Sequence, residues 1–410
     1  MSRAGQPLAL VAGAGIGGLA VGIACGRAGF DVQVFERAAA FAPIGAGIQL
    51  GPNATRVLHG WGLNDAFAAI ASFPDQLVVH HAHGGSELGS LPLGERAVRR
   101  YGAPYATVHR GDLHRLLLDA FHAQPHTHLH LGQQIDAFTQ DEAGVAMPFT
   151  NSGDATKQAG LLVGADGLWS AVRERLLIDG PPQAVGHLAY RALVRQSDLP
   201  EPVRNRNQVN VWLGRRLHVV AYPVRGGDWL NVIGIVHRPR DRAHKTPRSW
   251  DEATDAADLL AAIGDCSTTL EALIRAVPAW RLWALYDRPP MRSAREHGHG
   301  RVVLIGDAAH PMRPYLAQGA GMAIEDAAML EAVLTGTDTM AIPPALKRFA
   351  EQRWRRNARV QARARRNSEI FHATGLLAAG RNLAMRLLGA RLLDLPWLYG
   401  YIGAWPVPPR

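Results

Sequence analysis

The stretch GAGIGG, residues 13–18, constrains the fold of this chain more than any other feature. It follows the apolar run LALVA at residues 8–12 and opens a second apolar stretch with the pattern of a helix. Gly13, Gly15 and Gly18 have the GxGxxG spacing. In this motif the first glycine permits a tight turn, the second lets a pyrophosphate approach the backbone, and the third lets helix and strand pack closely. The phosphate then lies at the positively polarised end of the helix.

An acidic residue follows at the distance that a dinucleotide site requires. The run DVQVFE, residues 31–36, is typical of a second strand and ends on Glu36, eighteen residues after Gly18. A carboxylate in this place binds the ribose hydroxyls of an adenosine. Strand, turn, helix and acid together predict a dinucleotide site, and the alternative is a glycine turn that serves only packing. Arg37 faces either the adenosine or solvent.

The uncharged stretch from Leu8 to Gly26 is long enough to raise the question of a membrane span or a signal peptide. Its many glycines, the charge of Arg27 directly after it and the lack of a small-residue cleavage site favour the nucleotide turn instead. Two cysteines, Cys25 and Cys266, are too few for a disulfide framework, so we expect a cytoplasmic protein.

The length of 410 residues suits two lobes or one large discontinuous domain. The net charge of +9 is either a bias of composition or a field that attracts anions such as a carboxylate or a pyridine nucleotide. Its densest basic run, residues 353–367, is typical of an amphipathic helix with a solvated face. No aromatic platform or nucleic-acid motif accompanies this run, so we do not expect nucleic acid as a partner. Because the stretch from Leu8 to Gly26 is interpreted as a nucleotide turn, we do not expect a membrane as a partner either.

The middle of the chain alternates between apolar and polar residues in short runs separated by turns such as residues 225–228, which predicts an antiparallel sheet with one covered face. A helical section is expected over 250–277, and an earlier helix is expected to have Asp112 as its N-cap. The predicted fold is α/β, a Rossmann-like lobe interrupted by a mostly antiparallel sheet lobe and followed by helices. The expected first lobe comprises residues 1–72, 101–180 and 288–365, the sheet lobe 73–100 and 181–287, and the C-terminal helical segment 366–410.

Two further strands end on an aspartate. GADG ends one at Asp166, and GDAAHP ends another at Asp307. Each alone is more often a helix cap or turn former. In order and separation, however, the three motifs match the fingerprints of the FAD-dependent aromatic hydroxylases, and the chain resembles that family over nearly its whole length. The phrases HRGDLH, YRALVRQ, YPVRGG and WLYGY are similar to its 3-hydroxybenzoate 6-hydroxylase, 6-hydroxynicotinate 3-monooxygenase and salicylate hydroxylase members.

The resemblance implies FAD as cofactor. It implies that Asp307 accepts hydrogen bonds from the ribityl chain, that Arg110 contacts FAD and that Asp166 holds the DG turn near it. A helix beginning near Gly319 and Ala320 then directs free N–H groups at the flavin, where they favour the negative charge of its reduced form.

No second GxGxxG follows a strand, so a standing NAD(P)H site is not predicted. In the resembled family NADH or NADPH only visits, and O2 then forms a flavin C4a-hydroperoxide that hydroxylates an electron-rich ring. No sequence motif for a metal site is present either. The alternatives are a flavin reductase or dehydrogenase without oxygen transfer and a non-catalytic flavin-binding protein. A homodimer is a further possibility.

Four residues match family positions at the substrate. His218 and Tyr222, four apart on one predicted strand, share a face, and Tyr105 and Pro314 match an active-site tyrosine and the loop beside the flavin. With an unperturbed pKa of about 6.5, His218 would take or shuttle the proton of a phenol. The alternative is a histidine and a tyrosine that are satisfied within the sheet. His310 is interpreted as structural.

The resemblance leaves the substrate open among small hydroxylated aromatic carboxylates of the 3-hydroxybenzoate, 6-hydroxynicotinate and salicylate types. The 3-hydroxybenzoate enzymes carry Gln where this chain has Pro314. The 6-hydroxynicotinate enzymes share the proline but carry His in place of Gln49 and Tyr315, which are therefore candidate substrate residues.

Overall fold

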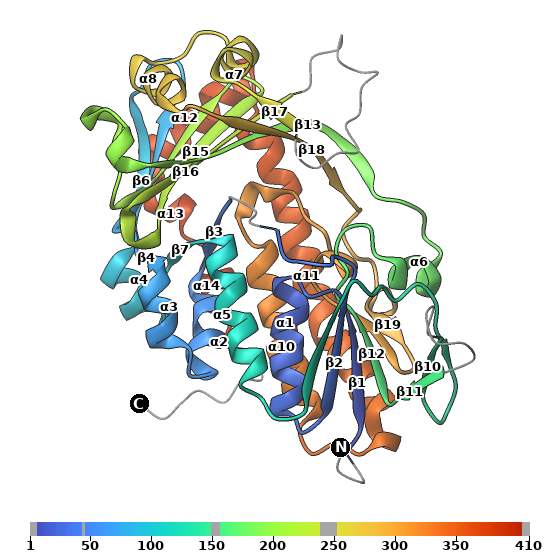
Figure 1. Ribbon diagram of the computed structural model, residues 1–410. Helices are drawn as coiled ribbons and strands as arrows, with labels where there is room; N and C mark the ends of the chain where they lie inside the picture. Colours follow the sequence, from blue (N-terminus) through green and yellow to red (C-terminus); the bar gives the residue numbers. More distant parts are fainter. Residues whose placement is uncertain (1–5, 43–45, 149–155, 238–251, 404–410) are drawn as a thin grey trace.

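The computed structural model describes residues 6–42, 46–148, 156–237 and 252–403, and its helices and strands form two lobes (Figure 1). The α/β fold with an inserted sheet lobe and C-terminal helices is confirmed.

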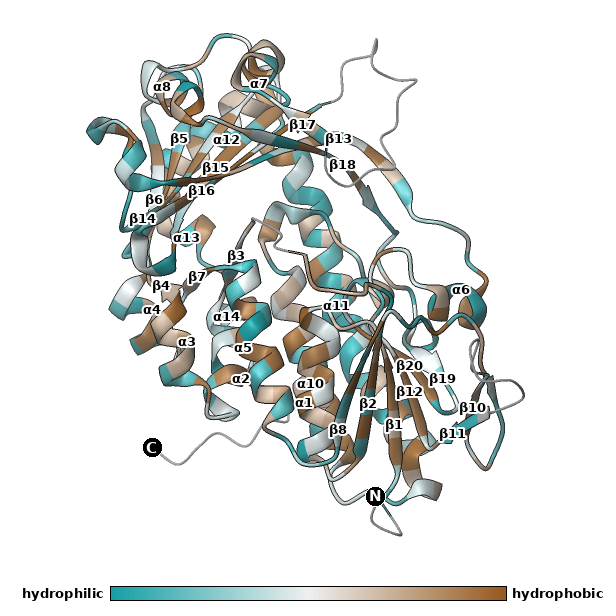
Figure 2. Cartoon of the chain, viewed as in Figure 1, coloured by the Kyte–Doolittle hydropathy of each residue, from teal (hydrophilic) through white to brown (hydrophobic). Residues whose placement is uncertain are grey.

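The first lobe is built on a six-stranded sheet whose inner strands are parallel. Its order is β19 (Gly298–His299), β20 (Val302–Leu304), β12 (Leu161–Gly164), β1 (Leu8–Ala12), β2 (Asp31–Glu36) and β8 (Thr127–Leu131). Figure 2 shows that β1, β2 and β12 are strongly hydrophobic, as expected for strands that are covered on both faces.

Helices cover one face of this sheet and a small second sheet covers the other. The helices are α1 (Ile16–Arg27), α5 (Arg110–His122) and α10 (Gly319–Leu334), which share a buried core with Val11 and Val34 (Figure 1). On the opposite face, Leu10 and Leu162 pack with residues of the antiparallel sheet of β11 (Thr156–Ala159), β10 (Val145–Pro148) and β9 (Thr139–Gln140), and with α6 (Ala171–Leu177).

The second lobe is an eight-stranded sheet, antiparallel except where β14 pairs with β5. Its order is β17 (Glu252–Thr254), β18 (Trp280–Asp287), β13 (Gln183–Arg195), β16 (Trp229–His237), β15 (Leu217–Val224), β14 (Gln208–Gly214), β5 (Gln76–His81) and β6 (Glu87–Pro92). One face packs on α7 (Ala256–Ile263) and α8 (Thr268–Ala276). Period-two alternation leaves the other side chains on the face that looks toward the first lobe.

A three-stranded sheet and short helices join the lobes. The sheet has the order β3 (Gly47–Leu50), β7 (Ala106–His109) and β4 (Ala71–Ser72), and the helices are α2 (Pro52–Gly60), α3 (Asn64–Ile70) and α4 (Gly94–Tyr101). A hydrogen bond of 2.6 Å from the backbone N–H of Gly47 to Oδ1 of Asn231 ties β3 to β16. The first lobe therefore reaches the covered face of the large sheet through β3.

The C-terminal helices are α11 (Ile342–Phe371), α12 (Gly375–Leu388), α13 (Ala390–Leu393) and α14 (Pro396–Tyr399). The expected boundary between residues 365 and 366 falls inside α11. The other proposed boundaries stay predictions. Among the described residues, none of the helices has the length and apolar character that crossing a bilayer would need.

The basic run at 353–367 does more than present a solvated face. Arg353 is fully buried; its Nε donates to Oδ1 of Asp326 at 2.8 Å, and its Nη1 donates to Oε2 of Glu325 at 2.8 Å. Asp326 also pairs with His310 at 2.5 Å and accepts from the backbone N–H of Gly306 at 3.1 Å. This network fixes the turn after β20, and the interpretation of His310 as structural agrees with its place in it.

Two local predictions are wrong. The N-cap of α5 is His109, not Asp112, whose carboxylate instead receives Nε of Arg225 at 2.7 Å. Tertiary ion pairing thus overrides the local capping role. The section expected to be helical from residue 250 begins outside the described residues, and its first described element is the strand β17, because this segment pairs with β18.

Candidate functional site

The glycine turn packs directly against the end of β12. Gly13 has a φ of +92°, and a Cβ there would lie 2.6 Å from the carbonyl oxygen of Ala165 and 2.9 Å from Cα of Asp166. A Cβ on Gly18 would lie 1.8 Å from the carbonyl oxygen of Gly13. Only hydrogen fits at these two positions, which explains two of the three glycines by close packing.

Gly15 has a different environment. Apart from Gly15 and its two chain neighbours, no described residue has an atom within 4 Å of the position that its Cβ would take, and its φ of −72° suits any residue. It precedes α1, whose first N–H groups have no acceptor within the helix. Open backbone at a positively polarised helix end is what a pyrophosphate needs, so the turn fits a dinucleotide.

Glu36 lies against this turn at the end of β2. Its Oε2 accepts from the backbone N–H of Ala14 at 2.9 Å, and its Oε1 accepts from the N–H of Ala38 at 2.9 Å. The carboxylate is therefore held beside the glycine turn, as a ribose-binding acid requires. Arg37 is exposed, and its role stays a prediction.

Asp307 lies in the short helix α9 (Gly306–Ala309), directly after β20. Burial raises its pKa, whereas the charges of His310 and Arg110 act to lower it. Its side chain is nevertheless exposed. Asp307 is thus surrounded by protein although its side chain is accessible to solvent, so it lies in a recess. Arg110 is close enough to affect its pKa.

The start of α10 adjoins this recess. The helix begins at Gly319, as predicted, and a Cβ on that residue would lie 3.9 Å from Oδ1 of Asp307. Its N-cap residue, Gln318, makes no side-chain capping bond. The N–H groups of Gly319 and Ala320 are thus among those that a helix leaves free for a negatively charged ligand.

Asp166 supports the turn that follows β12. Its Oδ1 accepts from Oγ of Ser170 at 2.5 Å, and its Oδ2 accepts from the N–H of Val172 at 3.2 Å. The carboxylate therefore fixes the start of α6 and, with Gly167 at a φ of +82°, the shape of the DG turn. Its closeness to a cofactor stays a prediction.

Three of the predicted substrate residues form one hydrogen-bonded group on the covered face of the large sheet. The hydroxyl of Tyr105 donates to Oε1 of Gln49 at 2.6 Å. The side chain of Gln49 also bonds Tyr222, whose pKa burial raises. Both tyrosines are buried, with their rings in the core between the lobes.

His218 and Tyr315 form a second group farther along β15. Their ring centroids lie 4.9 Å apart, and Nδ1 of His218 lies 2.9 Å from Nε2 of His372. Burial lowers the pKa of His218 to about 3, with His187 adding to the effect. The expected unperturbed pKa therefore does not hold, and His218 is a neutral hydrogen-bonding group near pH 7.

The two groups bracket a stretch of sheet. His218 and Tyr222 lie on one face of β15 with Val220 between them, about 13 Å apart along the strand by its rise per residue. Pro314 is exposed and begins the short 3₁₀ turn Pro314–Leu316, whose next residue, Tyr315, is buried.

Sequence reasoning missed Arg191 as a site residue. It lies on β13, with its guanidinium 3.6 Å from the ring centroid of Trp283. Burial lowers the pKa of Arg191 to about 9, and Tyr222 and Arg110 lie near enough to influence it. Within the described chain, its buried Nε has no hydrogen-bond partner. The sequence signal that could have identified it is the single charged residue in the alternating run LAYRALV, which is predicted to be a strand of the covered sheet.

Fold and site together define a flavin-dependent oxidoreductase: the open glycine turn, the carboxylate of Glu36 beside it and the exposed Asp307 beside a helix start all fit FAD. The chain belongs to the FAD-binding domain family, whose model matches residues 8–364. It is an FAD-dependent aromatic hydroxylase, as its relatives indicate.

Among these relatives, the 3-hydroxybenzoate 6-hydroxylase of Polaromonas naphthalenivorans (strain CJ2) is 36% identical over 396 residues, covering 96% of this chain and 95% of the relative. The 6-hydroxynicotinate 3-monooxygenase of Bordetella bronchiseptica (strain ATCC BAA-588 / NCTC 13252 / RB50) is 36% identical over 364 residues, covering 87% and 90%. A salicylate hydroxylase substrate complex superposes with a TM-score of 0.81 at 26% identity, covering 97% of this chain and 96% of that one. The resemblance inferred from the sequence is confirmed.

Proposed function

We propose that this enzyme uses NADH or NADPH and O2 to hydroxylate a small hydroxylated aromatic carboxylate. The substrate lies on the covered face of the large sheet, between the His218 group and the Tyr222 group. Bound FAD, once it has been reduced by the nicotinamide, would supply the activation of O2.

The observation that best supports this proposal is the environment of the Arg191 side chain. The Nε atom of Arg191 is buried and has no hydrogen-bond partner among the described residues, which is costly unless a ligand completes its bonding. A carboxylate matches the fork of its N–H donors. Arg191 is stacked on Trp283 and lies near Tyr222, so it would hold the carboxylate of an aromatic acid in one orientation.

The remaining side chains suit a phenolic ring. Neutral His218 is able to accept a hydrogen bond from a ring hydroxyl, and its own Nδ1 is held by His372 at 2.9 Å. Gln49 fixes both Tyr105 and Tyr222, so their hydroxyls are oriented before the substrate arrives. The relatives are named for 3-hydroxybenzoate, 6-hydroxynicotinate and salicylate, which all have an aromatic ring with a hydroxyl and a carboxylate, and this supports the substrate class.

The first experiment is a substrate panel. NADH and NADPH oxidation is followed with 3-hydroxybenzoate, salicylate and 6-hydroxynicotinate, and each product is identified after reaction under ¹⁸O2. We expect ¹⁸O in the product of at least one acid. Oxidation of the nicotinamide without labelled product would favour the reductase alternative.

The second experiment tests the carboxylate assignment. Removing one partner of a buried charge pair costs about 2–5 kcal/mol, so Arg191→Gln should lower kcat/KM for the acid by roughly 30- to 5,000-fold. Arg195→Gln, at an exposed arginine on the same strand, is the matched control. The amide analogue of the acid should lose far less activity from Arg191→Gln. Equal losses for acid and amide would refute the assignment.

A homodimer and a cytoplasmic location stay predictions.

A further inference from the structure

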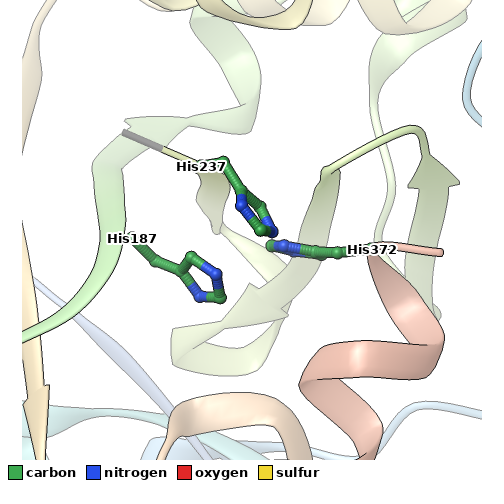
Figure 3. A group of neighbouring side chains, drawn as sticks. All are labelled: His187, His237 and His372. Carbon is green, nitrogen blue, oxygen red and sulfur yellow. The ribbon is translucent and has the colours of Figure 1, made fainter. Parts of the chain in front are cut away.

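Three histidine rings from distant parts of the chain form a triangle where the paired strands β13 and β16 of the large sheet meet the end of α11 (Figure 3). The ring centroids of His187 and His237 lie 4.3 Å apart, those of His187 and His372 4.9 Å, and those of His237 and His372 5.0 Å. One ring nitrogen of each lies within 4.8 Å of the others. His187 and His372 are buried, and His237 is exposed.

The backbone holds the three residues in place. His187 and His237 are directly opposed in the register of β13 and β16, so their side chains leave the sheet on the same face. The N–H of His237 donates to the carbonyl of Arg216 at 3.0 Å, and the N–H of Arg216 donates to the carbonyl of His372 at 3.2 Å. One residue thus ties the end of α11 to the end of β16.

Hydrogen bonds leave one nitrogen of each buried ring for another partner. Nδ1 of His187 lies 2.5 Å from the hydroxyl of Tyr315, which leaves Nε2. Nε2 of His372 faces His218, and its Nδ1 is buried without a hydrogen-bond partner among the described residues. Since His372 is only 5% exposed, water does not readily satisfy this nitrogen.

The three rings are in the form that binds metals. Burial lowers the pKa of His187 to about 3 and lowers the pKa values of His237 and His372 below their usual range. All three imidazoles are therefore neutral near pH 7, with a lone pair available.

We propose that His187, His237 and His372 form a binding site for a divalent transition metal ion, and we assign it to Zn²⁺. Zn²⁺ binds imidazole nitrogens at about 2.0–2.1 Å, which places tetrahedral ligands about 3.4 Å apart. Small ring rotations would bring the observed nitrogens to that spacing. The exposed His237 provides the route of entry, and a water molecule completes the coordination.

No metal site was expected because the three ligands have no local spacing that a sequence motif records. Tyr315 would act on the metal through His187, since a hydrogen bond on the second nitrogen fixes the ring and its tautomer. The charges of Arg216 and Arg313, which lower the pKa values of His237 and His187, also oppose a dication. We therefore expect a dissociation constant on the order of micromolar.

Zn²⁺ on Nδ1 of His372 would leave the ring proton on Nε2, which would then donate to Nδ1 of His218. The other nitrogen of His218 would then carry its proton, so that with Zn²⁺ bound His218 would donate to the ring hydroxyl of the substrate instead of accepting from it. This consequence for catalysis rests on the proposed function of His218, whereas the metal site itself does not.

Calorimetric titration of the metal-free holoenzyme with Zn²⁺ tests the site. We expect one Zn²⁺ per chain, at least a tenfold weaker binding in His237→Gln, and unchanged binding in the control His128→Gln, which alters an exposed histidine on β8. His237 is exposed, so its variant should fold.

A second measurement uses Co²⁺, whose visible spectrum reports tetrahedral nitrogen coordination. We expect that spectrum in the wild-type protein and its loss in His237→Gln. No saturable Zn²⁺ binding in the wild type, or equal binding in His237→Gln, would overturn the proposal. Because neither measurement uses an aromatic substrate, the result stands apart from the success or failure of the proposed hydroxylation.

Discussion

Replacing Gly15 with alanine separates the two explanations of the glycine turn, a cofactor site or simple packing. Beyond its own chain neighbours, the new methyl group meets no atom of the described residues within 4 Å, and the φ of −72° accepts alanine. The apoprotein should therefore fold normally, at a cost of about 1 kcal/mol or less for an alanine N-cap. Bound FAD, however, would find the methyl group where its pyrophosphate approaches the backbone.

The size of the loss follows from packing energetics. Forcing an additional methyl group into a filled space costs about 1–3 kcal/mol, so the Kd for FAD should rise about 5- to 150-fold. Apoprotein is titrated with FAD, and binding is followed by quenching of flavin fluorescence. Thermal unfolding of the apoprotein, measured separately, should show little change in Tm.

Two variants frame this result. Gly380→Ala also adds a methyl group into open space, within α12, and should leave FAD affinity unchanged. Gly18→Ala would place a Cβ 1.8 Å from a backbone oxygen and should prevent correct folding. If Gly15→Ala folds and binds FAD with the wild-type Kd, the pyrophosphate does not pass over this residue and the reasoning is wrong.

Two further predictions concern the turn after β20. Asp307→Ala should raise the Kd for FAD by about 10- to 150-fold, because it removes a charged hydrogen-bond acceptor worth about 1.5–3 kcal/mol; FAD titration measures this, and an unchanged Kd would contradict it. Asp326→Asn should destabilise the protein by about 3–5 kcal/mol, because it leaves the buried charge of Arg353 poorly compensated. The ion partners hold the folded-state pKa of Asp326 far below its usual range, so its stabilisation is present above about pH 4 and declines as the pH falls below that. Urea unfolding from pH 7 down to pH 3 should show a weaker decline in Asp326→Asn, and parallel curves would count against this.

The nucleotide-binding half of the site was predictable because its determinants are local. A glycine spacing, a strand before it and an acid after it fix the turn at Gly13 to Gly18 and the place of Glu36. The helix start near Gly319 was instead expected from the resemblance to a family. Their meeting point required the resemblance to a family, since nothing in composition brings Asp166 and Asp307 together.

The roles of several side chains depend on contacts with residues distant in the sequence, and these contacts could not be predicted. Asp112 looks like a helix cap, but it pairs with Arg225 across the two lobes. Arg353 reads as part of a solvated basic face, yet its charge is matched by two acids on α10. The histidine triangle depends on strand register and on the end of α11, and neither can be read from spacing along the chain.

The continuity of α11 limits how the enzyme is able to open. Its 30 residues make a rod about 45 Å long. Arg353 clamps it to α10 in the first lobe, and Phe371 at its far end packs against the ring of His218 in the sheet lobe. A hinge movement that parted the lobes would have to bend this rod or pull one end from its seat. We therefore expect short surface segments to move during substrate entry and product release, while the two lobes keep a fixed relative orientation throughout the catalytic cycle.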